Sequence, residues 1–560
     1  MTTHYMAPSD ARLAASVLLL RDAAPSTGSA SSLEVLMLRR ADRAGDMRSG
    51  VMVFPGGVLD ARDRDAHIHC LGPDDASVSA RMGLALGGLD YFVAAVRETF
   101  EEVGLLLTDT EVDTASLAGW RERLQQGSAS AAEFCQHLSL RLDLRGLVYM
   151  SHWLTPPGSP QRFDTRFFMA LAPPRQQAQA DLGEAQELMW LSPAQALDRE
   201  RGLRLLPVTQ RLLQSLGEHA SADAAMQAAR ALQQVPLIMP RRASSVRGAR
   251  VVLPHELPYA EVARLDPLGH GQTHADLLAG RAVQLSPHII RVTAPNPGPM
   301  TGPGTNSYLV GQGDEWTAID PGPLSPDHLQ ALRAAVPGRI TQILVTHTHR
   351  DHSPGAAALS AATGAPVLGR VADHPQWQDD SFAPSRELQD GERLQLGPRV
   401  TLRVIHTPGH ASNHLCYLLE EERTLFTGDH VMQGSTVVIN PPDGDMSAYL
   451  ASLAQLLDVE LDWLAPGHGF LVAQPHDVLR GLIAHRLRRE AKVLAALQLM
   501  THGGASEAAA GATLDELVLK VYDDVPAALH AMAKRSLLAH LLKLRGDGRA
   551  RQDEEAWSAI

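Results

Sequence analysis

Four side chains that commonly bind metal ions fall within six consecutive positions of this 560-residue chain: His347, His349, Asp351 and His352. A largely apolar run from 340 to 345 precedes them and predicts a buried strand. A Pro-Gly pair and an Ala-rich run from 356 to 362 follow them, which predicts a turn and then a helix. We therefore expect these ligands on a loop at the carboxyl end of a strand, where α/β sheets present their chemistry.

Imidazole and carboxylate ligands without thiolate suit Zn²⁺, and Fe or Mn is also compatible with them. One such cluster cannot complete two metal shells, so further ligands are expected on later loops. Three candidates follow predicted strands, each beside a glycine that lets the backbone turn sharply: His410, Asp429 and His468. Three other histidines lie close to these positions in the sequence and are interpreted as bystanders: His406, His414 and His430.

The His-x-His-x-Asp-His run, followed by His, Asp and His in Gly-containing loops, resembles the metallo-β-lactamase fold of hydrolases. The resemblance implies an αββα sandwich with two metal ions, expected to be Zn²⁺, at one edge of its sheets. The first metal would be held by His347, His349 and His410. The second would be held by Asp351, His352 and His468, with Asp429 bridging the two.

Asp351 is also the catalytic candidate of this half. Water between two metal ions has a lowered pKa, and a nearby carboxylate can orient it or accept its proton. The fold does not fix the substrate, because it carries thioester, phosphodiester and lactam hydrolysis alike.

The first part of the chain contains a second set of candidate ligands. Residues 94 to 105 predict a helix, and Glu98, Glu101 and Glu102 fall on one face of it. Repulsion among them costs about a few tenths of a kcal/mol per pair, which a bound divalent cation would reverse. Oxygen ligands alone suit Mg²⁺ or Mn²⁺. The alternative is an ordinary solvated acidic helix face.

This stretch resembles the Nudix box, GX5EX7REUXEEXGU, of enzymes that cleave nucleoside diphosphates linked to another moiety. The second half of the box matches from Arg97 to Leu105, with Thr99 at one of the positions marked U. The first half departs from it, because a long insert separates Gly57 from Arg97, and the first Glu of the box has no aligned counterpart. An insert after Phe-Pro-Gly-Gly resembles the branch that contains coenzyme A diphosphatases.

By that resemblance Glu98 and Glu102 bind Mg²⁺ or Mn²⁺. Glu101 supports them as the catalytic candidate, and Arg97 forms a structural salt bridge. Glu184 or Glu187 is an alternative base. The interrupted box leaves two possibilities open: a pyrophosphatase that acts on a nucleoside diphosphate derivative, or a degenerate domain that senses one.

Length, charge and cysteine content set the remaining limits. A chain of 560 residues predicts about two to four domains. A net charge of −13 gives no overall basic surface that would indicate nucleic-acid binding. The three cysteines are far apart in the sequence, which favours a reducing compartment. Neither a signal peptide nor an apolar run long enough to span a membrane is recognisable, so we expect a cytoplasmic protein.

We predict a multidomain chain of the α/β and α+β classes. A Nudix α/β/α sandwich is expected over 11–215, a connector over 216–283, the metallo-β-lactamase sandwich over 284–475 and a winged-helix-like helical tail over 476–560. The sandwich and tail together resemble the branch named after human β-lactamase-like protein 2, whose characterised members cut single-stranded RNA. The phrase from 431 to 446 and the C-terminal helices carry that match.

The substrate of the C-terminal half stays open between RNA and a small thioester or ester, as in glyoxalase-II-like members. Six basic residues of the tail could follow RNA phosphates or form a solvated helix face: Arg486, Arg488, Arg489, Lys534, Arg535 and Lys543. The acidic net charge argues mildly against tight RNA binding. A metal-stabilised binding protein with a nucleotide-sensing Nudix half is the non-enzymatic alternative. No membrane partner is expected, and a homodimer is compatible with the sequence.

Overall fold

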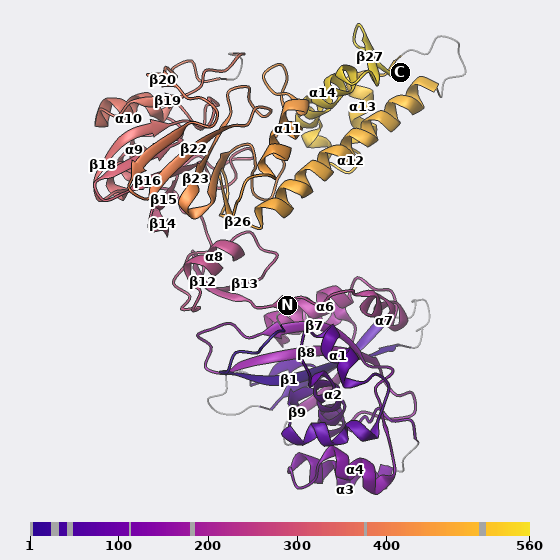
Figure 1. The fold of residues 1–560 in the computed structure, drawn as a ribbon. Helices are drawn as coiled ribbons and strands as arrows, with labels where there is room; N and C mark the ends of the chain where they lie inside the picture. Colours follow the sequence, from indigo (N-terminus) through magenta and orange to yellow (C-terminus); the bar gives the residue numbers. More distant parts are fainter. Residues whose placement is uncertain are drawn as a thin grey trace. The chain divides into compact units, whose positions relative to one another are not determined.

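The computed structural model describes residues 4–23, 33–41, 49–110, 114–179, 185–374, 378–502 and 511–560. The chain divides into two compact units (Figure 1). The first comprises Met1–Arg242, Ala249–Pro254 and Leu268–Gly271, and the second comprises Ala243–Gly248, His255–Pro267 and Gln272–Ile560. Among the described residues, we find no helix whose length and apolar character would let it cross a membrane.

The first unit is built on a nine-stranded mixed sheet in the order β10-β3-β2-β1-β8-β7-β11, with β4 paired to β1 and β9 paired to β2. Its strands are β1 (Ala11–Asp22), β2 (Leu33–Arg40), β3 (Val51–Val53), β4 (Gly56–Val58), β7 (Val148–Leu154), β8 (Arg162–Leu171), β9 (Ala185–Leu191), β10 (Arg204–Leu205) and β11 (Leu237–Ile238). The central strand β1 runs parallel to β8 and antiparallel to β2 and β4.

Alternate residues of β1 enter two separate cores, because successive side chains of a strand point to opposite faces. Val17 and Leu19 pack with α2 (Gly88–Val103), while Leu18 and Leu20 pack with other helices. On the α2 side lie η1 (Ala61–His69), α1 (Asp75–Arg81), α3 (Thr114–Gln125), α4 (Ala131–Leu138) and the short pair β5 (Cys70–Leu71) and β6 (Leu142–Asp143). On the other side lie α5 (Pro193–Leu197), α6 (Pro207–Leu216) and α7 (Ala222–Ala231). The predicted α/β/α sandwich is confirmed.

The second unit contains two sheets packed face to face. The seven-stranded sheet follows chain order: β14 (Ala282–Ser286), β15 (Ile289–Thr293), β16 (Asn306–Gln312), β17 (Glu315–Ile319), β18 (Arg339–Leu344), β19 (Val367–Gly369) and β20 (Arg386–Glu387). The six-stranded sheet does the same: β21 (Arg393–Gly397), β22 (Val400–His406), β23 (Leu415–Leu419), β24 (Thr424–Gly428), β25 (Trp463–Pro466) and β26 (Val472–Ala473).

The apolar faces of the two sheets meet in one core, to which Val310 and Leu344 contribute from the first sheet and Val404 and Phe426 from the second. Helices α9 (Pro326–Ala335) and α10 (Gly355–Thr363) cover the outside of the first sheet (Figure 1). Helix α11 (Met446–Leu456) covers the outside of the second sheet. This arrangement is the predicted αββα sandwich.

The C-terminal tail packs around a small core of its own. Helices α12 (Pro475–His502), α13 (Leu514–Val521) and α14 (His530–Gly546) enclose it, and the hairpin of β27 (Ala550–Asp553) and β28 (Ala556–Ala559) closes it with Trp557. This is the predicted winged-helix-like tail, and the hairpin supplies its two-stranded wing.

The predicted connector contains regular structure of its own. After β11 the chain forms the hairpin of β12 (Arg241–Ser245) and β13 (Gly248–Val252) and then the short helix α8 (Tyr259–Leu265). Within the second unit, Glu261 of α8 forms a buried ion pair with Arg291 of β15, at 2.6 Å. The helix is therefore attached to the first sheet of the sandwich.

Candidate metal centre

The predicted metal ligands of the second unit all follow the carboxyl ends of strands. His347, His349, Asp351 and His352 lie between β18 and α10, whereas His410 follows β22, Asp429 follows β24 and His468 follows β25. Strand β18 runs parallel to β17, and β25 runs parallel to β24. Parallel neighbours end at the same edge of a sheet, so the strand-end loops meet there.

Three of these histidines form one compact group: His347, His349 and His410. The Nδ1 atom of His349 lies 3.0 Å from Nε2 of His347 and 3.0 Å from Nε2 of His410. Burial holds the pKa of His347 well below its usual value and lowers the pKa of His349 to about 3. The imidazoles are therefore neutral at physiological pH, and their lone pairs suit a cation.

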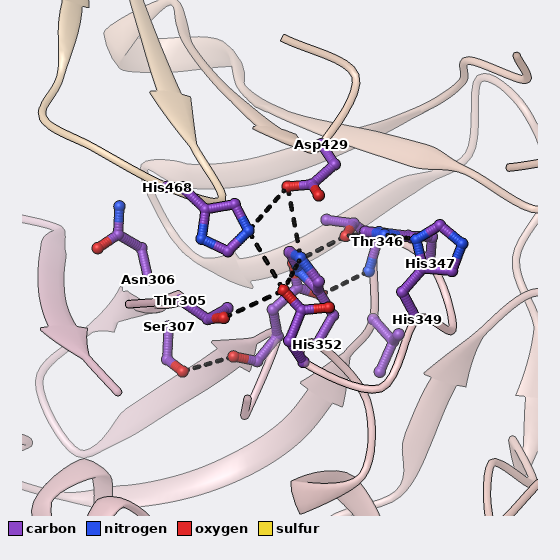
Figure 2. Close-up of polar contacts among 12 residues, drawn as sticks. Thr305, Asn306, Ser307, Thr346, His347, His349, His352, Asp429 and His468 are labelled. Atoms are coloured by element: carbon purple, nitrogen blue, oxygen red, sulfur yellow. Dashed lines mark hydrogen bonds and ion pairs between the residues drawn. The ribbon is translucent and has the colours of Figure 1, made fainter. Parts of the chain in front are cut away.

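The other four residues form the second group: Asp351, His352, Asp429 and His468. In Figure 2, the rings of His352 and His468 point toward the carboxylate of Asp429, whose Oδ1 lies 3.4 Å and 3.3 Å from the two Nε2 atoms. The Oδ2 atom of Asp351 lies 3.3 Å from Nε2 of His468. The Oδ2 atom of Asp429 lies 3.8 Å from Nε2 of His410, so Asp429 stands between the two groups.

The donor atoms of the second group fit a divalent cation. Among the described residues, Nε2 of His352, Nε2 of His468 and Oδ1 of Asp429 are buried without a hydrogen-bond partner. Burial opposes the charge on His468, but Asp429 and Asp351 outweigh it and raise the pKa of His468 to about 10. A bound metal ion would take the place of that proton, because metal ligands bind in their deprotonated form.

Groups outside the cluster fix the orientation of its rings. Nδ1 of His352 lies 2.9 Å from Oδ2 of Asp320, and the backbone N–H and hydroxyl of Thr346 donate to the same carboxylate at 2.7 Å each. Nδ1 of His410 lies 2.8 Å from the carbonyl of Val438, and Nδ1 of His468 lies 3.2 Å from the carbonyl of Gly304. In each ring this leaves Nε2 to face the ligand position.

Sequence reasoning assigned no role to Asp320 or Val438. Asp320 follows the apolar strand β17 and precedes Pro-Gly, and it adopts a φ of 50° that is uncommon outside glycine. An acidic residue between an apolar strand and Pro-Gly is visible in the sequence, and it could have indicated a partner for the metal ligands. A backbone carbonyl such as that of Val438 leaves no signal in the sequence.

The three histidines interpreted as bystanders lie outside both groups. The His414 ring lies 5.0 Å from that of His347 between centroids, and its Nδ1 contacts the hydroxyl of Thr407. His430 packs edge-on against Tyr449. His406 makes a hydrogen bond to the carbonyl of Ser412.

In the first unit, two of the three candidate carboxylates contact the guanidinium of Arg97. Nη1 of Arg97 lies 2.8 Å from Glu98 and 3.1 Å from Glu101, while Glu102 accepts a hydrogen bond from the backbone N–H of Gly56 at 2.8 Å. Arg97 therefore offsets the repulsion between Glu98 and Glu101. Burial raises the pKa of Glu98 to about 7 in spite of this contact.

The sequence comparison gives the first Glu of the Nudix box no aligned counterpart, and the structure adds an acidic partner of Arg97, Asp63. It is the sixth residue after Gly57, as in GX5E, it is 1% exposed, and it binds Arg97 at 2.8 Å. The insert comes after Asp63, and the fold brings both ends of the insert together.

The structure describes only one of the two alternative bases, Glu184 and Glu187. Glu187 lies on β9, about half exposed, 4.0 Å from Arg39. Glu184 lies outside the described residues. Among the described residues, only the two groups in the second unit bring three or more potential metal ligands together.

Three family models match successive parts of the chain. The NUDT19 Nudix domain matches residues 85–204, the metallo-beta-lactamase superfamily matches 300–468, and the beta-lactamase associated winged helix domain matches 513–557. Lactamase-like protein aptB from Emericella nidulans is 33% identical over 244 residues, which cover 43% of this chain and 75% of that protein. The chain belongs to the metallo-β-lactamase superfamily.

Two further proteins match the same half of the chain. The atrochrysone carboxyl ACP thioesterase from Aspergillus chevalieri is 34% identical over 269 residues, which cover 47% of this chain and 83% of that protein. The crystal structure of a metallo-beta-lactamase family protein from Thermus thermophilus has 23% identity and a TM-score of 0.41, and the match covers 49% of this chain and 100% of that one. This superfamily member is a hydrolase fused to a Nudix domain, and its ligand groups imply a divalent metal in the C-terminal half.

Proposed function

We propose that the metallo-β-lactamase half hydrolyses a thioester with a pair of divalent metal ions, Zn²⁺ being the first candidate. The observation that carries the proposal is the convergence of two ligand groups with Asp429 between them. The first ion would be held by His347, His349 and His410. The second would be held by Asp351, His352 and His468, and Asp429 lies between the two groups.

Asp351 is the proposed catalytic carboxylate. Its side chain is 26% exposed, whereas that of its neighbour His352 is fully buried, so Asp351 is the more accessible to a water molecule. The hydroxyl of Thr305 lies 3.4 Å from its Oδ2 and limits its rotation. When bound, the metal pair lowers the pKa of water and polarises the scissile carbonyl. Asp351 then orients the water or accepts its proton, and the buried imidazoles exclude competing solvent.

The relatives support a thioester rather than RNA as substrate. One relative that spans most of the C-terminal half is named as an ACP thioesterase. This agrees with the thioester alternative drawn from the sequence and not with RNA cleavage.

The tail supports the same choice, because its basic residues are largely engaged within the chain. Arg486 is buried and donates to the carbonyl of Val437. Arg489 makes two hydrogen bonds to Asp524. Lys534 pairs with Asp515, and Lys543 pairs with Glu490 and Asp547. Charges neutralised in this way release few counterions on contact with RNA, and that release supplies most of the affinity of nonspecific nucleic-acid binding.

Thiol release is the direct test. Acyl thioesters of coenzyme A and of a phosphopantetheinylated carrier protein are incubated with the full chain loaded with Zn²⁺, beside a fluorescent single-stranded RNA. We expect thiol from a thioester, and a loss of at least about a hundredfold in the Asp351→Asn variant. The matched control is His4→Ala, an exposed histidine of the first unit. RNA cleavage without thiol release would refute the proposal.

We further propose that the Nudix half hydrolyses a nucleoside diphosphate derivative with Mg²⁺ or Mn²⁺. A specific contact favours it: a Cβ on Gly57 would lie 2.3 Å from Oε2 of Glu98, so only glycine leaves that carboxylate its place beside β4. Glu98 and Glu102 would hold the cation at this Gly-Gly turn. Glu101, held by Arg97, is the candidate for proton transfer.

An acyl-coenzyme A contains both a thioester and a diphosphate, so it is the first compound to test on both halves. Hydrolysis of the diphosphate of acyl-coenzyme A with Mg²⁺ would release adenosine 3′,5′-bisphosphate and an acyl 4′-phosphopantetheine. Their release, abolished by Glu102→Gln and retained by Asp351→Asn, would support two separate centres. No diphosphate cleavage of coenzyme A or of ADP-sugars would indicate a degenerate Nudix domain.

A further inference from the structure

The loop that follows Asp429 connects the metal centre to the C-terminal tail. This loop runs from Val431 to Asp445, between β24 and α11. Within it, the carbonyl of Val438 lies 2.8 Å from Nδ1 of His410. Because a carbonyl only accepts, His410 carries its proton on Nδ1 and directs the lone pair of Nε2 toward His349, 3.0 Å away.

Two residues of the tail hold the backbone on either side of Val438. Arg486 on α12 donates through Nη2 to the carbonyl of Val437 at 2.5 Å. Ser536 on α14 accepts a hydrogen bond from the backbone N–H of Ile439 at 3.4 Å. We infer that the tail positions the metal ligand His410, with Arg486 and Ser536 as the residues that do so.

Arg486 has the burial and contacts that this role requires. It is 4% exposed, and its guanidinium lies 5.4 Å from the centroid of the Tyr449 ring on α11. The hydroxyl of Tyr449 donates to the carbonyl of His430, the residue after Asp429. Arg486 therefore contacts Tyr449 of α11, which holds the start of the loop. It also contacts the peptide that joins Val437 to Val438.

The far end of the loop is held by residues outside the tail. The carboxylate of Asp443 accepts hydrogen bonds from Nε2 of Gln378 at 3.0 Å and from the backbone N–H of Ser412 at 3.2 Å. Val437 and Ile439 are buried in a cluster that also contains Leu479 of α12 and Ala539 of α14, so their packing also involves the tail. With the far end held by Asp443, we expect the contacts of Arg486 and Ser536 to help direct the carbonyl of Val438 toward His410.

This inference rests on the metal centre proposed above, and it distinguishes the two ligand groups. Nδ1 of His352 contacts Asp320 and Nδ1 of His468 contacts Gly304, neither of which belongs to the tail. Loss of Arg486 should therefore weaken the ion held by His347, His349 and His410 and spare the other ion. A general loss of structure would affect both.

The test is metal titration of the full chain. Metal-free protein is titrated with Co²⁺, and the affinities of the first and second ions are obtained from the visible absorption, with circular dichroism as a check of folding. Arg486→Met removes the donor with little change of volume, and Ser536→Ala removes the acceptor. Arg488→Met, at an exposed position of the same helix, is the matched control.

We expect Arg486→Met to weaken one of the two ions by about tenfold or more, as for other groups that orient metal ligands. Ser536→Ala should have a smaller effect in the same direction, and Arg488→Met should behave as wild type. Equal affinities for wild type and Arg486→Met overturn the inference, and so does loss of both ions together with the folded signal. Wild-type protein that binds fewer than two ions overturns the metal centre itself, and the inference with it.

Discussion

Arg97 and Asp63 are 34 positions apart in the chain, yet Nε and Nη2 of the guanidinium bind Oδ1 and Oδ2 of the carboxylate at 2.8 and 3.2 Å. The two side chains are 10% and 1% exposed. The same guanidinium contacts Glu98 and Glu101. One buried cation therefore organises the acidic residues of the Nudix half.

Replacement of Asp63 by Ala should destabilise the first unit. It leaves the Arg97 charge buried with fewer acceptors, and breaking a buried ion pair costs about 3 kcal/mol. Urea unfolding followed by circular dichroism measures the change. Asp65→Ala, at an exposed position two residues later, should stay within about 0.5 kcal/mol of wild type. Similar results for the two variants would show that the Asp63–Arg97 pair is not structural.

Replacement of Gly57 by Ala should weaken Mn²⁺ binding in the Nudix half by about tenfold or more. The new Cβ would lie 2.3 Å from Oε2 of Glu98, so that carboxylate must leave its position. Electron paramagnetic resonance of free Mn²⁺ measures the binding. The control is Gly119→Ala in α3, where a Cβ meets no atom within 4 Å. Unchanged Mn²⁺ binding by Gly57→Ala would remove Glu98 from the proposed site.

Replacement of Gly467 by Ala should lower the metal content of the C-terminal half. A Cβ at this position would lie 2.8 Å from Oδ1 of Asp429 and 2.8 Å from Cε1 of His352, two members of the second ligand group. Elemental analysis of purified protein should give about two metal ions per chain for wild type and about one or fewer for the variant. Gly481→Ala on α12, where the Cβ meets no atom within 4 Å, should retain both.

His328 should make the second unit less stable as the pH falls. Burial lowers its pKa from 6.5 to about 4, and Nε2 contacts the hydroxyl of Ser307 at 2.8 Å. Between these pH values the unfolded chain binds a proton that the folded chain does not. The contribution of His328 is therefore complete above pH 6.5 and is lost progressively toward pH 4, at about 1.4 kcal/mol per pH unit.

The His328→Asn variant should reduce the loss of stability between pH 7 and pH 5 by about 2 kcal/mol. Urea unfolding at both pH values, on metal-free protein, measures it. His255→Asn, at an exposed position, should leave the pH dependence unchanged. An unaltered slope in His328→Asn would show that this histidine is protonated equally in the two states.

The sequence alone determined the fold class and the kinds of domain present. Apolar runs followed by glycine and by His or Asp identify strands whose loops meet at one sheet edge. This is why the metal-ligand candidates from His347 to His468 could be proposed from the sequence alone. The second half of the Nudix box could also be recognised from the sequence. Arg97 and the residues from Glu98 to Glu102 occupy adjacent turns of one helix, so their spacing is local.

Only the tertiary structure decided how distant positions are combined. Asp63 joins Arg97 because the fold brings together the two ends of a long insert, and no local pattern reports such a pairing. Arg486 and Arg488 belong to one basic run, but helix packing buries the first against Val437 and exposes the second. The partner of His410 is a backbone carbonyl, which every residue carries. Local periodicity therefore predicts the elements, while burial and hydrogen-bond partners follow from long-range packing.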